Sequence, residues 1–249
     1  MENHEKPMDA RERLIVALDV PSAKEALAIM EALGEEVTFY KVGLELFTAA
    51  GMEFVRELRR RGKQCFLDLK LFDIGETVAR AVAVIAREDI DFLTVHGEEQ
   101  VMKAAAGAKG ASRLRLLAVT VLTSLDQDDL KKMGIAMSVD ELALQRARSA
   151  AECGCDGVIT SAREARAIKE ATGGRMLMVT PGIRLGEGDV QDQKRVATPA
   201  VAIENGADYL VVGRPITRAE NPRQAARAMA AEMQAAFDRR SRAPLREPT

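Results

Sequence analysis

Tryptophan is absent from this 249-residue chain, and aromatic residues supply only 4% of it. Proteins that bind single-stranded nucleic acid stack bases on aromatic side chains, so this composition is not typical of them. The formal net charge is −2 and there is no long basic run, which argues against a general nucleic-acid-binding protein. A small anionic substrate needs only a local cluster of cationic groups. We therefore expect a small-molecule ligand and no nucleic-acid partner.

Long apolar runs are also missing: none could span a bilayer, and the first thirteen residues are too charged for a signal peptide. We expect a cytoplasmic protein with no membrane partner, and three cysteines fit a reducing compartment. With only His4 and His96, a His-rich metal centre is excluded. Cys153 and Cys155 lack the paired spacing of a zinc site and are interpreted as small apolar residues. Neither a metal nor a cofactor is expected.

Apolar, β-branched runs are abundant and recur along the whole chain, which is 47% hydrophobic and 30% charged. Runs of this kind predict buried strands, and the segments between them carry apolar residues at helical spacing. The eight predicted strands span 14–20, 38–46, 64–70, 91–97, 114–123, 156–162, 175–183 and 208–214.

Eight strand–helix units with near-continuous apolar strands favour an α/β fold, a single-domain (β/α)₈ TIM barrel. An open doubly wound sheet is the alternative, although no G-x-G-x-x-G follows the first strand. The barrel is expected over 13–238, after a flexible segment at 1–12 and before a disordered tail at 239–249. Two long connections, at 124–155 and 184–207, are expected at the catalytic face.

Helix starts are marked by local signals. Ser22 with Glu25, and Ser138 with Glu141, have the spacing of capping boxes. The pairs Thr198-Pro199 and Asn221-Pro222 predict an N-cap followed by proline in the first turn.

Charged residues stand at the ends of several predicted strands, where they are unexpected. Asp68 and Lys70 are two apart in the third strand, so their side chains share a face. Asp19 ends the first strand and Lys41 lies in the second. Because these positions belong to the catalytic end of a barrel, the four charges are expected to converge there. His96 ends the fourth strand and is interpreted as a hydrogen-bonded core residue.

A purely structural salt-bridge network is the alternative to a site, but each buried charge costs several kcal/mol unless it is compensated. Lysines repel a metal cation, which argues against a metal site. A lysine beside carboxylates keeps its ammonium charge, which suits a proton donor rather than a Schiff-base nucleophile. The pattern predicts metal-free stabilisation of a carbanion, with Lys70 as the acid.

Polar and glycine-rich segments follow the seventh and eighth strands, where barrels often bind phosphate. They contain the run from Pro181 to Arg184, then Gln193, and then Gly213 with Arg214. Glycine permits close approach of the backbone, and an arginine fork matches phosphate oxygens. We expect a phosphorylated substrate.

Taken in order, these motifs resemble the orotidine 5′-phosphate decarboxylases. The resemblance runs from about Leu14 to beyond Arg214. It is carried by LIVALDV, FYKVGLEL, FLDLKLFDIGETV, AVTVLTS, TPGIR followed by DQKRVATP, and VVGRPIT. The D-x-K-x-x-D-I-x-x-T string within the third motif is the most specific part.

The resemblance implies a homodimeric barrel that converts orotidine 5′-monophosphate to UMP and CO₂ without a cofactor. It implies a catalytic chain with Lys70 protonating pyrimidine C6, and with Asp73 and Thr77 reaching the neighbouring subunit's site. The catalytic residues implied are Lys41, Asp68, Lys70 and Asp73. The substrate-binding residues implied are Asp19, Lys41, Thr77, Thr123, Ser124, Pro181, Arg184, Gln193, Gly213 and Arg214.

The sequence leaves two other functions open. Sugar-phosphate enzymes such as 3-keto-L-gulonate 6-phosphate decarboxylase and hexulose phosphate synthase resemble this chain in D-x-K-x-x-D. They carry Glu in place of Lys41, where it serves a Mg²⁺, so Lys41 argues against them. A catalytically inactive barrel that acts as a binding subunit is the second alternative, and the full set of charges argues against it.

Overall fold

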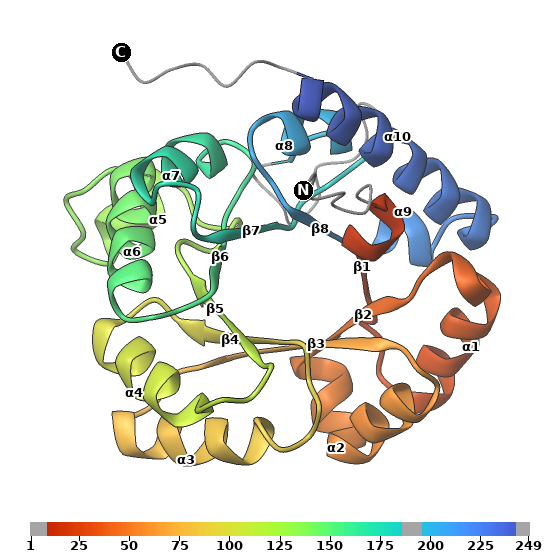
Figure 1. Ribbon diagram of the computed structural model, residues 1–249, viewed down its shortest axis with the longest axis horizontal. Coiled ribbons are helices and arrows are strands. Elements are labelled where there is room, and N and C mark those ends of the chain that lie inside the picture. The colour runs from red at the N-terminus through yellow and green to blue at the C-terminus, as the bar shows by residue number, and fades with distance from the viewer. Residues whose placement is uncertain (1–8, 186–195, 243–249) are drawn as a thin grey trace, which may run out of the picture.

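The computed structural model describes residues 9–185 and 196–242. Eight parallel strands pair in sequence order, and β8 pairs with β1 to close a barrel (Figure 1). The predicted barrel fold is therefore confirmed, and the open sheet is excluded. The strands are β1 Leu14–Ala17, β2 Phe39–Gly43, β3 Gln64–Leu71, β4 Phe92–His96, β5 Arg115–Val119, β6 Gly157–Ile159, β7 Leu177–Thr180 and β8 Tyr209–Val212.

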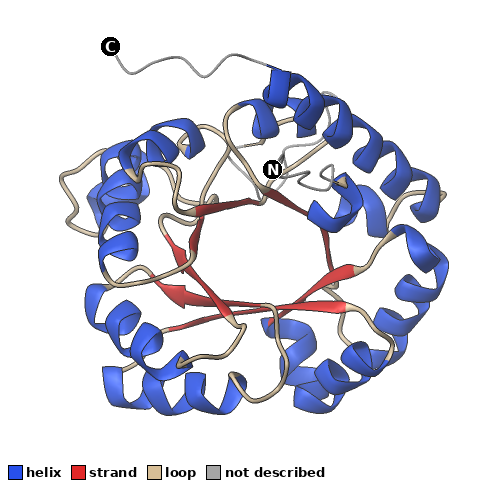
Figure 2. Cartoon of the chain, viewed as in Figure 1, coloured by secondary structure: helices blue, strands red, loops and turns tan. Residues whose placement is uncertain are grey.

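Helices surround the ring of strands on its outside, as Figure 2 shows. They cover the outward faces of the strands, which explains why the strands are apolar on both faces. The α-helices are α1 Ala23–Leu33, α2 Leu44–Arg60, α3 Gly75–Ile85, α4 Glu99–Lys109, α5 Gln127–Lys132, α6 Val139–Glu152, α7 Ala165–Ala171, α8 Pro199–Glu204, α9 Arg214–Thr217 and α10 Pro222–Arg242. Two 3₁₀ turns, η1 Ala10–Arg13 and η2 Gly34–Glu36, precede β1 and β2.

The barrel interior is a packed core of its own. Phe39, Phe66, Phe92 and Tyr209 point inward, and the rings of Phe39 and Phe92 have centroids 5.1 Å apart. Residues of the opposite parity, such as Leu67, face the helices and join the larger outer core. Polar side chains further along the inward faces therefore lie above this aromatic layer, at the carboxyl ends of the strands.

The predicted helix starts are confirmed. Ser138 and Glu141 form a complete capping box, and the Ser22 hydroxyl accepts a hydrogen bond from the Glu25 N–H. Thr198 caps α8 and has proline directly after it. Asn221 accepts a hydrogen bond from the backbone of Gln224 at the start of α10.

Several predicted strands were too long at their carboxyl ends. The second was expected to reach Leu46, but β2 ends at Gly43 and α2 begins at once. The fifth was expected to reach Thr123, but β5 ends at Val119. The physical reason is the same in both places: apolar residues continue past the last paired residue, some buried, such as Leu46 and Val121, and others exposed, so hydrophobicity alone does not mark the strand's end.

The expected domain limits fall inside secondary structure. The 3₁₀ turn η1 spans the limit at 12, and α10 continues past 238 to Arg242. Residues 1–8 and 243–249, where flexible ends were expected, lie outside the described residues. Within the described ranges, no helix combines the length and apolarity needed to cross a membrane.

Candidate active site

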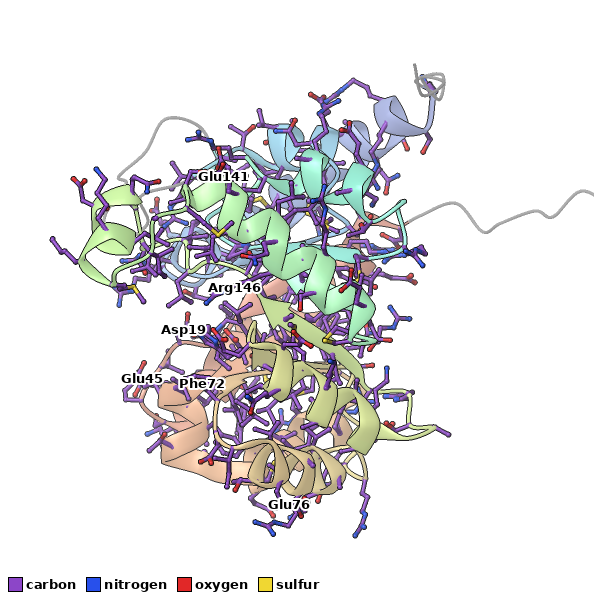
Figure 3. All side chains as sticks on the ribbon, turned by 90° about the vertical axis from the view of Figure 1, so that its left-hand side faces the viewer. Asp19, Glu45, Phe72, Glu76, Glu141 and Arg146 are labelled. Carbon is purple, nitrogen blue, oxygen red and sulfur yellow. The ribbon has the colours of Figure 1, made fainter. Side chains whose placement is uncertain are left out.

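A cavity of about 950 Å³ opens at the carboxyl ends of the strands. Figure 3 shows Asp19, Glu45 and Phe72 together on this side of the molecule. Most of the predicted site residues line it, although they are far apart in the sequence. Those residues are Asp19, Lys41, Asp68, Lys70, Thr123, Ser124, Pro181, Arg184, Gly213 and Arg214.

Four of these side chains form a chain of alternating charge. Lys41 Nζ lies 2.9 Å from Asp19 Oδ1 and 3.6 Å from Asp68 Oδ2. Lys70 Nζ donates to both carboxylate oxygens of Asp68, at 2.9 Å each. The convergence predicted from the strand ends is therefore present in one row across β1, β2 and β3.

The inner members of this row are buried. Lys41 is 8% exposed and Asp68 is 9% exposed, so each would be costly without a partner of opposite charge. Burial by itself raises the pKa of Asp68, but the charges of Lys41 and Lys70 and its hydrogen bonds outweigh burial. The pKa of Asp68 consequently lies below its ordinary value, and the carboxylate is ionised at neutral pH.

Gly43 makes room for the pair at the outer end of the row. A Cβ atom at this position would lie 3.0 Å from Lys41 Nζ and 3.1 Å from Asp19 Oδ1. Any side chain there would therefore crowd both charged groups, so the glycine permits their close approach.

Lys70 has an unusual backbone. Its φ is 49°, in the left-handed region that a residue with a side chain rarely occupies. The pairing of β3 with β4 also changes register here: Leu67 is opposite Leu93, but Leu71 is opposite Val95. The strand therefore bulges at Lys70, a kind of irregularity that is common beside active sites because it redirects a side chain.

Thr94 is a residue of this site that the sequence analysis missed. It is fully buried on β4, and its hydroxyl donates to Asp68 Oδ1 at 2.8 Å and accepts from the Lys70 N–H at 2.9 Å. A single threonine in the run FLTV is an ordinary strand former. The only available signal was its inward parity, which it shares with Phe92.

The side of the cavity near β7 and β8 carries the predicted phosphate-binding groups. Arg184 follows β7 and donates from Nη1 to the Ile183 carbonyl at 2.8 Å. Gly213 and Arg214 form the turn into α9, and both line the cavity. Arg218, which was not predicted, also lines it. Gln193 lies outside the described residues.

Among the predicted site residues that the structure describes, Asp73 and Thr77 are those that do not line the cavity of their own chain. Asp73 is exposed, and its Oδ1 accepts from the Ile74 N–H at 2.6 Å. Its neighbours Phe72 and Ile74 are apolar yet 64% and 71% exposed. An apolar surface of this kind beside a site is typical of a contact with another chain.

The expectation for His96 was wrong in one respect. Its Nδ1 is buried but has no hydrogen-bond partner among the described residues, and the nearest oxygen of Glu98 is 4.0 Å away. The ring packs instead on Phe72, with centroids 4.5 Å apart. Burial and the nearby Arg146 lower the pKa of His96, opposed by Glu98.

The charges border open space instead of filling the mouth of the barrel, as a structural plug would. Within the described part of the chain, no group of three or more His, Cys, Asp or Glu side chains is arranged to hold a metal ion. The arrangement can hold a polar ligand between the charged row on β1–β3 and the arginines on the opposite side, with an ammonium group in the cavity wall.

Comparisons with known proteins agree with this geometry. Residues 12–229 match the family described as "Orotidine 5'-phosphate decarboxylase / HUMPS family". The chain is 52% identical to a Nitrobacter winogradskyi protein named orotidine 5′-phosphate decarboxylase, over 90% of this chain and 93% of the relative. A Ruegeria pomeroyi protein of the same name is also 52% identical, over 91% and 95%. The crystal structure of orotidine 5′-phosphate decarboxylase from Lactobacillus acidophilus superimposes with a TM-score of 0.78 at 38% identity, covering 88% of this chain and 98% of that one.

Proposed function

The chain belongs to the orotidine 5′-phosphate decarboxylase / HUMPS family, and it decarboxylates orotidine 5′-monophosphate in pyrimidine biosynthesis; we propose that Lys70 is the proton donor of this reaction. The observation that carries the proposal is the ammonium of Lys70, which lines the cavity while Asp68 holds it through two hydrogen bonds. The charge is thus in place before any reaction begins.

In the proposed step, the bond between pyrimidine C6 and the carboxylate carbon breaks, and its electron pair stays on C6. CO₂ leaves, and a proton from Lys70 Nζ moves to C6 to give UMP. An ammonium that is already oriented stabilises the developing negative charge without reorganisation, and preorganised stabilisation of this kind is usually the largest single contribution to catalysis. Asp68 keeps Lys70 oriented. It would also lie beside the carboxylate of the bound substrate and repel that group before CO₂ leaves.

We assign the rest of the cavity by charge. Asp19 and Lys41 are placed to bind the ribose hydroxyls, since one accepts and the other donates hydrogen bonds. Thr123 and Ser124, in the loop after β5, would contact the base. Pro181, Arg184, Gly213, Arg214 and Gln193 would form the phosphate side.

We further propose a homodimer with shared active sites. The cavity of one chain lacks Asp73 and Thr77 among its lining residues, whereas exposed Phe72 and Ile74 lie beside Asp73 on the surface. Asp73 from a second copy would complete the row of charges next to Lys70.

A nucleotide substrate and free cysteines, none of them in a disulfide among the described residues, fit a cytoplasmic location.

The function is tested by the loss of absorbance when purified protein is added to orotidine 5′-monophosphate, with and without a chelator. Equal turnover in both conditions is expected. Turnover that disappears in chelator would favour the Mg²⁺-dependent sugar-phosphate relatives, and no turnover under either condition would favour an inactive barrel.

A further inference from the structure

Thr94 occupies a position from which one hydroxyl group reaches two parts of the proton-donating unit. It lies on β4, directly beside β3, and its side chain points into the barrel above Phe92. Its Oγ1 is 2.8 Å from Asp68 Oδ1 and 2.9 Å from the backbone nitrogen of Lys70. The threonine is fully buried, so water does not compete for these bonds.

The two hydrogen bonds have different consequences. As a donor, the hydroxyl fixes Asp68 Oδ1, which leaves Oδ2 facing Lys41 at 3.6 Å. As an acceptor, it satisfies the N–H of Lys70 at the residue where the strand bulges and φ is 49°. A left-handed conformation at a lysine is unfavourable, so it persists only where surrounding contacts hold it.

We infer that Thr94 is a positioning residue for proton donation: it fixes the rotamer of Asp68 and the bulged backbone of Lys70 together, so that the ammonium is held at one place in the cavity wall. This inference rests on the proposed function of Lys70. Thr94 does not line the cavity and acts through these two residues. Its hydroxyl serves as a brace between β3 and β4 at the point where their regular pairing is interrupted.

Three variants test the brace. Thr94→Val keeps the shape of the side chain and removes the hydroxyl, whereas Thr94→Ser keeps the hydroxyl. Thr180→Val is the matched control, because the Thr180 hydroxyl is equally buried in β7 but has no hydrogen-bond partner among the described residues. Should Thr94→Val fail to fold, Thr94→Ala takes its place.

For Thr94→Val we expect kcat for orotidine 5′-monophosphate to fall about tenfold to a hundredfold, the size of a lost hydrogen bond to a charged group, while KM changes much less. Thr94→Ser should stay near the parent kcat, and Thr180→Val should match the parent.

The pH profile of kcat distinguishes a positioning role of Thr94 from a general loss of stability of the barrel. The charged groups around Asp68 are Lys70 on β3 and Lys41 on β2, which in turn contacts Asp19 after β1. These remain in every variant. Thr94→Val removes a hydrogen-bond donor that stabilises the Asp68 carboxylate, so the pKa of Asp68 should rise in this variant. The acidic limb of its kcat profile should therefore move to higher pH, whereas the acidic limb of the Thr94→Ser profile should not move.

Crystal structures of the two Thr94 variants give a readout that does not need turnover. The contact of Lys70 Nζ with both oxygens of Asp68 should be lost in Thr94→Val and kept in Thr94→Ser. An unchanged contact in Thr94→Val, or equal kcat and pH limbs in the valine, serine and parent proteins, would overturn the inference. Absence of decarboxylation in the parent, or full activity of Lys70→Ala, would instead defeat the proposed function, and the crystallographic comparison would still decide the role of Thr94.

Discussion

Lys70 Nζ lies 2.9 Å from each carboxylate oxygen of Asp68, two residues earlier on the same strand. The contact coincides with the bulge in β3, where the backbone of Lys70 has a φ of 49°. A regular strand would hold the two side chains parallel and pointing away from the sheet. The irregular backbone thus brings an ammonium and a carboxylate into a fixed pair at the cavity wall.

Arg214→Ala is expected to weaken binding of the phosphorylated substrate by about 1.5–3 kcal/mol, the range for a hydrogen bond to a charged group. KM for orotidine 5′-monophosphate should rise, while turnover of unphosphorylated orotidine should change little. Arg148→Ala is the matched control, since Arg148 is exposed on α6 and does not line the cavity. An equal penalty for both substrates would remove the phosphate assignment.

Mixing two inactive proteins tests the shared site. Asp73→Ala lacks the residue donated to a neighbour, and Lys70→Ala lacks the residue used in its own cavity. A heterodimer of the two has one intact composite site, so activity should reappear after subunit exchange. Exchange itself is verified by native mass spectrometry of differently tagged subunits. If exchange is complete and activity stays absent, the site is not shared in this way.

Alkylation should distinguish the three cysteines. Burial raises the pKa of both Cys65 and Cys155 to about 12, whereas Cys153 is partly exposed and its pKa is raised less. The thiolate is the reactive form, and at pH 8 a thiol with a pKa of about 12 is almost wholly protonated. Iodoacetamide should therefore modify Cys153 first in the native protein, as measured by peptide mass spectrometry.

In denaturant all three cysteines should react at similar rates, which controls for differences in peptide recovery. Early modification of Cys65 in the native protein would contradict its burial in the outer core.

The fold was predictable because the strands are dense runs of apolar, β-branched residues and several helix starts carry a local signal. Thr198 and Pro199 illustrate this: cap and first turn are both set by neighbouring residues. The convergence of Asp19, Lys41, Asp68 and Lys70 also followed from simple parity and from the common end of parallel strands. These features depend on residues that are close in the sequence and on the regular geometry of parallel strands, so they can be predicted from the sequence.

Other features depend on contacts between strands and were not predictable. No glycine in the sequence marks the left-handed backbone conformation at Lys70. Tertiary contacts maintain this conformation, including the hydrogen bond to the Thr94 hydroxyl, and such contacts cannot be read from the sequence. Thr94 itself looks like any threonine in a strand until the register of β3 and β4 is known. The ends of β2 and β5 were placed too late because the residues that follow them remain apolar.

Lys70→Ala is expected to lower kcat by many orders of magnitude while the protein stays folded. Loss of CO₂ leaves negative charge on C6, and this variant lacks the ammonium that Asp68 holds through two hydrogen bonds, so that group can neither stabilise the charge nor supply the proton. Lys70→Arg should fail as well, because a planar guanidinium does not occupy the position of an ammonium and does not readily release a proton. Circular dichroism and binding of UMP establish that both variants are folded with an intact cavity, and the parent enzyme should keep full activity in chelator. Near-normal turnover by a folded Lys70→Ala protein would contradict the mechanism, because the ammonium held by Asp68 would then have no part in the chemical step.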